Sequence, residues 1–268
     1  MRRALLALTV VVLAASTVLL GGGHPTVVER PAAAAVALPL GGEPVELDPA
    51  QFTASIDHPY WPMRPGTRWV YRGTGADDDP RRIEVTVTGR TRTIMGIRAR
   101  VVHDVVTEEG EVIEDTYDWY AQDARGNVWY LGEDTRELED GKVTSREGSW
   151  QAGVDGAQPG ILLPASPGPG MVYRQEYDGA RAQDTAAVVS LHQRARVPSG
   201  LFDHVLITKE FTPLEPSLLK HDFYAFGVGP VLSLTVSGGS DREELLSYCR
   251  HPEPGPSCSW RSAGTARG

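Results

Sequence analysis

The stretch that decides the fold is YDWYAQDARGNVWYL, residues 117–131. Aromatic and apolar residues flank a polar segment with a glycine at Gly126, which is typical of two β-strands joined by a tight turn. Three of the six tryptophans lie between residues 115 and 150. We therefore predict that the sheet is organised around this hairpin.

Four short turns with glycine in the third position lie between residues 83 and 150. They are residues 94–96, 108–110, 124–126 and 139–141. A glycine in this position suits a three-residue hairpin loop, so the pattern predicts a five-strand antiparallel meander. Further strands are predicted at 171–177, 185–192, 204–212, 220–224, 231–237 and 242–248. The predicted fold class is all-β, a strongly curved antiparallel sheet or incomplete barrel, with no substantial helix beyond the N-terminal segment.

The overall charge argues against a nucleic-acid partner. The 268 residues carry a formal net charge of −9, and Lys and Arg are not clustered. Proteins that bind nucleic acids use clustered basic residues to neutralise phosphates.

The N-terminus is typical of an export signal. Arg2 and Arg3 precede an uncharged, mostly apolar run at 4–20, and three glycines follow. We predict a signal peptide or an uncleaved anchor at 1–23, the latter being the only expected membrane contact. A flexible Ala/Pro/Gly linker is predicted at 24–50, one β-domain at 51–248 and a tail at 249–268. The predicted localisation is extracytoplasmic.

The two cysteines, Cys249 and Cys258, both lie in this tail. In an oxidising compartment they are expected to form a local disulfide. Such a bond would close a short loop and secure the tail.

Counting outward from the turns predicts which face each side chain occupies. Trp119, Trp129 and Leu131 are placed on the core face, and Tyr120 and Tyr130 on a solvated face beside arginines. With Tyr117, the three core-face residues are the predicted ligand-binding set, because the inward side chains of a curved open sheet can line a cavity. Simple core packing is the alternative.

The same counting places four polar residues at one end of the core face: His103, Asp115, Glu133 and Glu147. It predicts that His103 pairs with Asp115 and that Glu133 pairs with Tyr117. A carboxylate could orient His103 as a general base, or the group could bind a divalent metal. Alternatively, the strand ends emerge into water, where charges are usually found. Familiar nucleophile, zinc-protease and phosphate-loop motifs are absent from the sequence, so we predict no cofactor and no metal.

Several stretches resemble a widespread family of uncharacterised bacterial secreted proteins. They are DHPYWP at 57–62 with PGTRWVY at 65–71, the hairpin at 118–133, and GSWQAGVDG at 148–156. The resemblance covers most of residues 57–244. It implies a β-rich fold and brings no catalytic residues with it.

The second half is similar to bacterial envelope β-proteins, some of them lipoprotein-like. VPSGLFD at 197–203 and YAFGVGPV at 224–231 carry this similarity. It implies a half-barrel around an apolar cavity, although the capping helix of lipoprotein carriers is not evident here. We predict a non-catalytic binding module for a lipid or another apolar or amphipathic small molecule, or an envelope scaffold. The alternative is a hydrolase that uses the His/carboxylate cluster.

Overall fold

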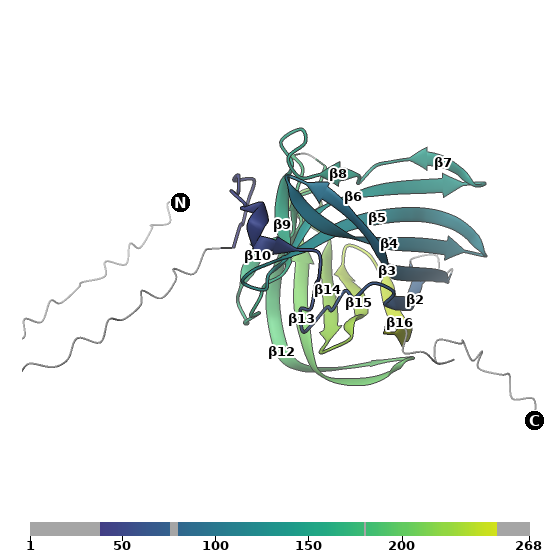
Figure 1. The fold of residues 1–268 in the computed structure, drawn as a ribbon. Coiled ribbons are helices and arrows are strands. Elements are labelled where there is room, and N and C mark those ends of the chain that lie inside the picture. Colours follow the sequence, from purple (N-terminus) through teal and green to yellow (C-terminus); the bar gives the residue numbers. More distant parts are fainter. Residues whose placement is uncertain (1–37, 76–79, 180, 251–268) are drawn as a thin grey trace, which may run out of the picture. The chain divides into compact units, whose positions relative to one another are not determined.

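The computed structural model describes residues 38–75, 80–179 and 181–250. Within these residues the chain forms one antiparallel sheet of 16 strands (Figure 1). The only helical element there is a short 3₁₀ turn, η1 (Pro49–Gln51). The described residues therefore contain no helix that is long and apolar enough to span a membrane. The prediction of an all-β, curved antiparallel sheet that does not close into a barrel is confirmed.

The strands follow the aromatic and β-branched runs of the sequence. Their bounds are β1 (Phe52–Thr53), β2 (Arg68–Thr74), β3 (Arg81–Ile94), β4 (Ile97–Glu108), β5 (Glu111–Asp123), β6 (Val128–Glu139), β7 (Lys142–Ser145), β8 (Trp150–Gln151), β9 (Gln158–Leu163), β10 (Val172–Arg174), β11 (Glu176–Tyr177), β12 (Thr185–Val197), β13 (Gly200–Phe211), β14 (Leu219–Ala225), β15 (Gly229–Ser237) and β16 (Arg242–Cys249).

One short segment joins the two ends of the sheet. The order of strands is β10-β12-β13-β14-β15-β16-β2-β3-β4-β5-β6-β9-β11. The end strands β10 and β11 do not pair with each other, but only Gln175 separates them in the chain. The segment therefore pairs with β12 through its first half and with β9 through its second. At this junction β9 approaches so closely that a Cβ atom on Gly160 would collide with the carbonyl oxygen of Gln175.

Three of the four predicted hairpin turns are shorter than expected. These three are two-residue loops, Met95-Gly96, Glu109-Gly110 and Asp140-Gly141, and both residues of each have positive φ. These angles are typical of the type I′ turn, which matches the twist of the flanking strands. The fourth connection, between β5 and β6, has four residues rather than three.

The shorter turns and several β-bulges change the predicted register. His103 pairs with Tyr117 rather than with Asp115, and Glu133 pairs with Asp118 rather than with Tyr117. Because a shift of one residue moves a strand's side chains to the other face, part of the predicted face assignment is wrong. Tyr120 and Tyr130, which were expected on a solvated face, are in the hydrophobic core cluster or packed against it.

The sheet around the opening hairpin is buried on both faces. Trp119 and Leu131 on one face are as buried as Tyr120 on the other. Part of the predicted linker packs against the domain core, with Leu38, Val45 and Leu47 in contact with it. Residues 38–50 thus differ from the flexible linker that the sequence predicted.

Arg174 helps to hold this N-terminal segment. Its buried guanidinium donates hydrogen bonds to the carbonyl oxygens of Gly41, Glu43 and Pro159. The predicted export signal at 1–23 and Cys258 lie outside the described residues. The disulfide between Cys249 and Cys258 therefore stays a prediction.

Candidate functional site

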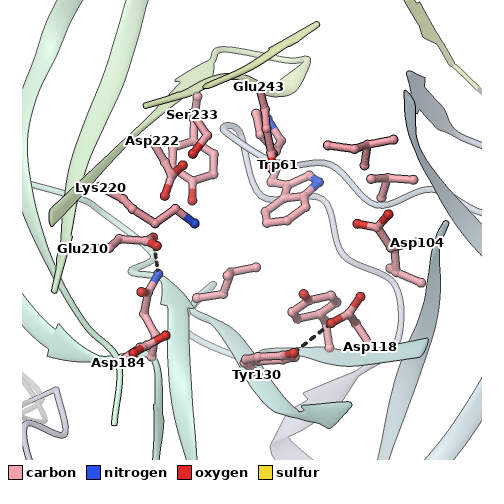
Figure 2. Close-up of a pocket in the computed structure, with 18 of the residues that line it drawn as sticks. Trp61, Asp104, Asp118, Tyr130, Asp184, Glu210, Lys220, Asp222, Ser233 and Glu243 are labelled. Carbon is pink, nitrogen blue, oxygen red and sulfur yellow. Dashed lines mark hydrogen bonds between the residues drawn. The ribbon is translucent and has the colours of Figure 1, made fainter. Parts of the chain in front are cut away.

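A cavity of about 320 Å³ lies between the two halves of the sheet (Figure 2). Apolar side chains from β3, β4, β9 and β15 line part of it, including Ile83, Val102, Leu162 and Leu232. Eight carboxyl groups also line it: Asp104, Asp118, Glu133, Glu176, Asp184, Glu210, Asp222 and Glu243. The cavity is therefore both apolar and strongly acidic.

Three of these carboxyl groups form what we call the acidic wall: Asp104 on β4, Asp118 on β5 and Glu133 on β6. Asp118 and Glu133 are directly paired across neighbouring strands. Asp118 accepts a hydrogen bond of 2.8 Å from the Tyr130 hydroxyl, and Glu133 accepts one of 2.8 Å from Thr135. The Oδ1 atom of Asp104 is buried and has no hydrogen-bond partner among the described residues.

Burial makes the charged form of this wall costly. It raises the pKa of Asp118 to about 6 and, together with the neighbouring charge of Asp118, that of Glu133 to about 7. Burial also raises the pKa of Asp104 well above its ordinary value, and the charge of Asp118 adds to this effect. The acidic wall thus holds three carboxyl groups whose protons are bound more tightly than usual.

The other side of the cavity is what we call the lysine wall: Glu210 on β13 with Lys220 and Asp222 on β14. Glu210 and Lys220 are cross-strand partners, and Figure 2 shows the ammonium group of Lys220 directed between the two carboxyl groups. The charge of Asp222 raises the pKa of Lys220, so the lysine stays protonated. Glu210 also accepts a 2.8 Å hydrogen bond from Gln175, the residue that joins the ends of the sheet.

Trp61 spans the space between the walls. Its ring lies 5.9 Å from that of Tyr120 on β5 and 6.0 Å from that of Tyr224 on β14, measured between centroids. Its Nε1 atom is buried and has no hydrogen-bond partner among the described residues. An indole N–H is a donor that usually finds an acceptor when buried.

Buried contacts fix the loop that carries Trp61. The Nε2 atom of His58 lies 3.0 Å from the carbonyl oxygen of Pro164, and burial lowers the pKa of His58, which favours the neutral ring. The carbonyl oxygen of Pro59 accepts a 2.7 Å hydrogen bond from the Gly227 amide. The DHPYWP motif therefore serves to place an aromatic ring in the cavity.

The predicted His/carboxylate cluster is not formed. His103 contacts Asp115 at 3.3 Å and stacks on Tyr117 with the ring centroids 4.3 Å apart. These residues occupy the face of the sheet opposite to the cavity, whereas Glu133 faces the cavity and Glu147 is exposed in the turn after β7. The bulge between Asp118 and Tyr120 accounts for the separation, because it moves Glu133 out of the row of Tyr117.

The predicted ligand-binding residues also do not line this cavity. Trp129 and Leu131 are buried in packing. Tyr117 and Trp119 line a separate hollow on the opposite face, where the guanidinium group of Arg92 lies 3.9 Å from the centroid of the Trp119 ring. A cation–π contact of this kind covers the aromatic ring.

The most important cavity residues were not singled out by the sequence patterns. Lys220, Asp222 and Tyr224 alternate along β14, which in isolation is typical of a strand with a solvated face. From the sequence alone, Asp104 resembles an ordinary surface residue. In the structure, the second half of the sheet covers it. Of the motifs quoted from the sequence, DHPYWP is the one that contributes to the cavity, because it supplies Trp61.

No metal centre is evident in the described part of the chain. No group of three or more His, Cys, Asp or Glu side chains there is positioned to hold a metal ion.

Comparisons with known proteins give two structural matches of low similarity. No family model matches the sequence, and neither does any curated protein. A crystal structure of a predicted exported protein with a YmcC-like fold from Bacteroides fragilis aligns with a TM-score of 0.42 at 12% identity. A predicted lipoprotein from Parabacteroides distasonis aligns with a TM-score of 0.39 at 12% identity. Each alignment covers 71% of this chain and 98% of the other.

Proposed function

We propose that the protein is an exported, non-catalytic binding module for an amphipathic small molecule, held in the cavity between the acidic wall and the lysine wall. The observation that carries this proposal is the cavity itself, which combines apolar side chains with buried polar groups. Its volume of about 320 Å³ falls at the lower end of the range typical of small-molecule sites. The N-terminal sequence supports export.

The composition of the lining favours an amphipathic ligand over a purely apolar one. Ile83, Val102 and Leu232 provide apolar contact, whereas the carboxyl groups would be poorly solvated by a hydrocarbon. A ligand with one apolar end and one polar end would satisfy both parts of the lining. Of the apolar and amphipathic small molecules expected from the sequence, the lining therefore favours the amphipathic ones.

The alternative of a hydrolase based on His103 has weaker support, because His103 and Glu133 lie on opposite faces of the sheet and Glu147 is exposed in the turn after β7. An envelope scaffold would need no cavity. Binding of a ligand inside the sheet is therefore the property that distinguishes the proposal from the scaffold.

The test is binding of a neutral fluorescent probe, N-phenyl-1-naphthylamine, to the purified full chain. We expect its fluorescence to increase on binding and the increase to be lost in Ser233→Phe, which places a ring in the cavity. Ser240→Phe is the matched control, because Ser240 is exposed and does not line the cavity. Equal binding by both variants, or no binding by the wild type, would argue against the proposal.

A further inference from the structure

The two walls of the cavity differ in whether a positively charged side chain lies beside their carboxyl groups. On the lysine wall, Lys220 faces Glu210 and Asp222. Among the described lining residues Lys220 is the one cationic side chain, so the acidic wall has no protein cation beside it. A buried carboxylate without a counter-charge is strongly unfavourable, and it takes up either a proton or a cation.

Asp104 marks the position where a ligand group would be received. Its Oδ1 atom is buried, lacks a hydrogen-bond partner among the described residues, and belongs to a side chain that Figure 2 shows directed into the cavity. Asp118 and Glu133, by contrast, each accept a hydrogen bond from the protein. An acceptor of this kind is suited to a donor or a positive charge supplied from the cavity.

Aromatic rings border the acidic wall on the cavity side. Tyr120 and Trp61 are in contact with each other, and both line the cavity beside Asp118. The face of an aromatic ring attracts an ammonium group, and aromatic rings together with carboxylates are the combination used to bind quaternary ammonium ligands. A hydrocarbon tail on such a ligand would find Ile83, Val85 and Val102 on the neighbouring strands.

From the uncompensated wall, the unpartnered oxygen and the adjacent rings, we infer that the ligand is an organic cation whose ammonium group binds against Asp104, Asp118 and Glu133. This inference rests on the proposed function and specifies the ligand class for the same cavity. A primary amine and a quaternary ammonium share the required chemistry. The apolar part of the ligand has to be short, because the cavity is small.

The test compares three probes with the same tail: hexyltrimethylammonium, 1-hexanol and hexanesulfonate. Each is titrated calorimetrically into the full chain at pH 8. We expect the cation to bind at least about tenfold more tightly than the alcohol, and the anion to bind most weakly. Equal or tighter binding of the alcohol or the anion would overturn the inference and leave the proposed cavity function standing. Failure of all three probes and of the neutral dye would count against both.

Three variants test where the charge of the ligand binds. Glu133→Gln is expected to weaken binding of the cation by about tenfold or more, whereas Glu147→Gln, at an exposed carboxyl, leaves it unchanged. Asp104→Asn provides a second variant, because no hydrogen bond to the Asp104 side chain is lost, and it should have the same effect. Circular dichroism confirms that each variant folds. Unchanged preference for the cation in both folded variants would contradict the assignment.

Discussion

The hydroxyl group of Tyr130 donates a 2.8 Å hydrogen bond to Asp118, and both residues face the cavity. The pair comes from the hairpin that organises the sheet, so one hairpin supplies core packing on one face and a polar wall on the other. The outer face holds Trp119 under Arg92. The candidate site therefore lies on the face of this hairpin that the sequence had suggested was solvated.

The first prediction concerns stability and pH. Burial raises the pKa of Asp118 to about 6 and of Glu133 to about 7, above their ordinary values. Between about pH 4 and 7 the folded state therefore binds more protons at these groups than the unfolded state does, so they lower stability as the pH rises. Urea unfolding of the wild type at several pH values should show this decline, and it should be shallower in Glu133→Gln. A slope that is the same in the wild type and the variant would contradict the assignment.

The second prediction concerns ligand binding and pH. A cation favours the ionised acidic wall, so affinity for hexyltrimethylammonium should rise as the pH increases from about 5 to 8, through the raised pKa values of Asp118 and Glu133. Asp104 and Glu243 line the same cavity and strengthen the effect together with Glu114. The charge of Glu114 raises the pKa of Asp118, and the charges of Glu114 and Glu243 raise that of Asp104. Calorimetry in buffers of different ionisation enthalpy should detect proton release on binding. Affinity that is flat across this range would count against the linkage.

The third prediction concerns the junction that joins the ends of the sheet. Gly160→Ala would force a Cβ atom into the backbone at Gln175, and overpacking of this kind costs about 1 to 3 kcal/mol. The control is Gly89→Ala, where a Cβ atom meets no neighbour within 4 Å. Chemical unfolding should show a clear loss of stability for the first variant and a change within about 0.5 kcal/mol for the second. Similar stabilities would show that close approach at β9 is not required.

The fourth prediction concerns the loop that carries Trp61. His58→Ala removes the contact with the Pro164 carbonyl, which should cost about 1 to 3 kcal/mol of stability and weaken binding of the dye. His192→Ala is the control, since that ring is exposed. If the two variants bound the dye equally, the position of the Trp61 ring would not depend on the contact between His58 and Pro164.

Much of the fold follows from local patterns in the sequence. The glycine turns and the alternating strands predicted the meander, and all six strands expected after residue 170 have counterparts in β10 to β16. The sequence did not reveal the β-bulges, such as the one between Asp118 and Tyr120, because a bulge depends on the partner strand. Each bulge shifts the register between two paired strands, and this shift is enough to move side chains from one face of the sheet to the other.

The candidate site was harder to predict for a physical reason. Asp104 and Lys220 lie 116 residues apart in the chain and line one cavity, in a sheet whose two ends are linked through β10 and β11. Charged residues on a strand normally indicate a solvated face. Here both faces of the sheet are covered, so alternation in one strand could not distinguish a cavity wall from the outside.

The most direct test of the central claim is native mass spectrometry of the full chain purified from its host without detergent. We predict a species heavier than the bare chain by the mass of one small molecule, which disappears in Ser233→Phe and persists in Ser240→Phe. The bare mass alone for the wild type, in protein that also fails to bind the neutral dye, would contradict a binding function for the cavity.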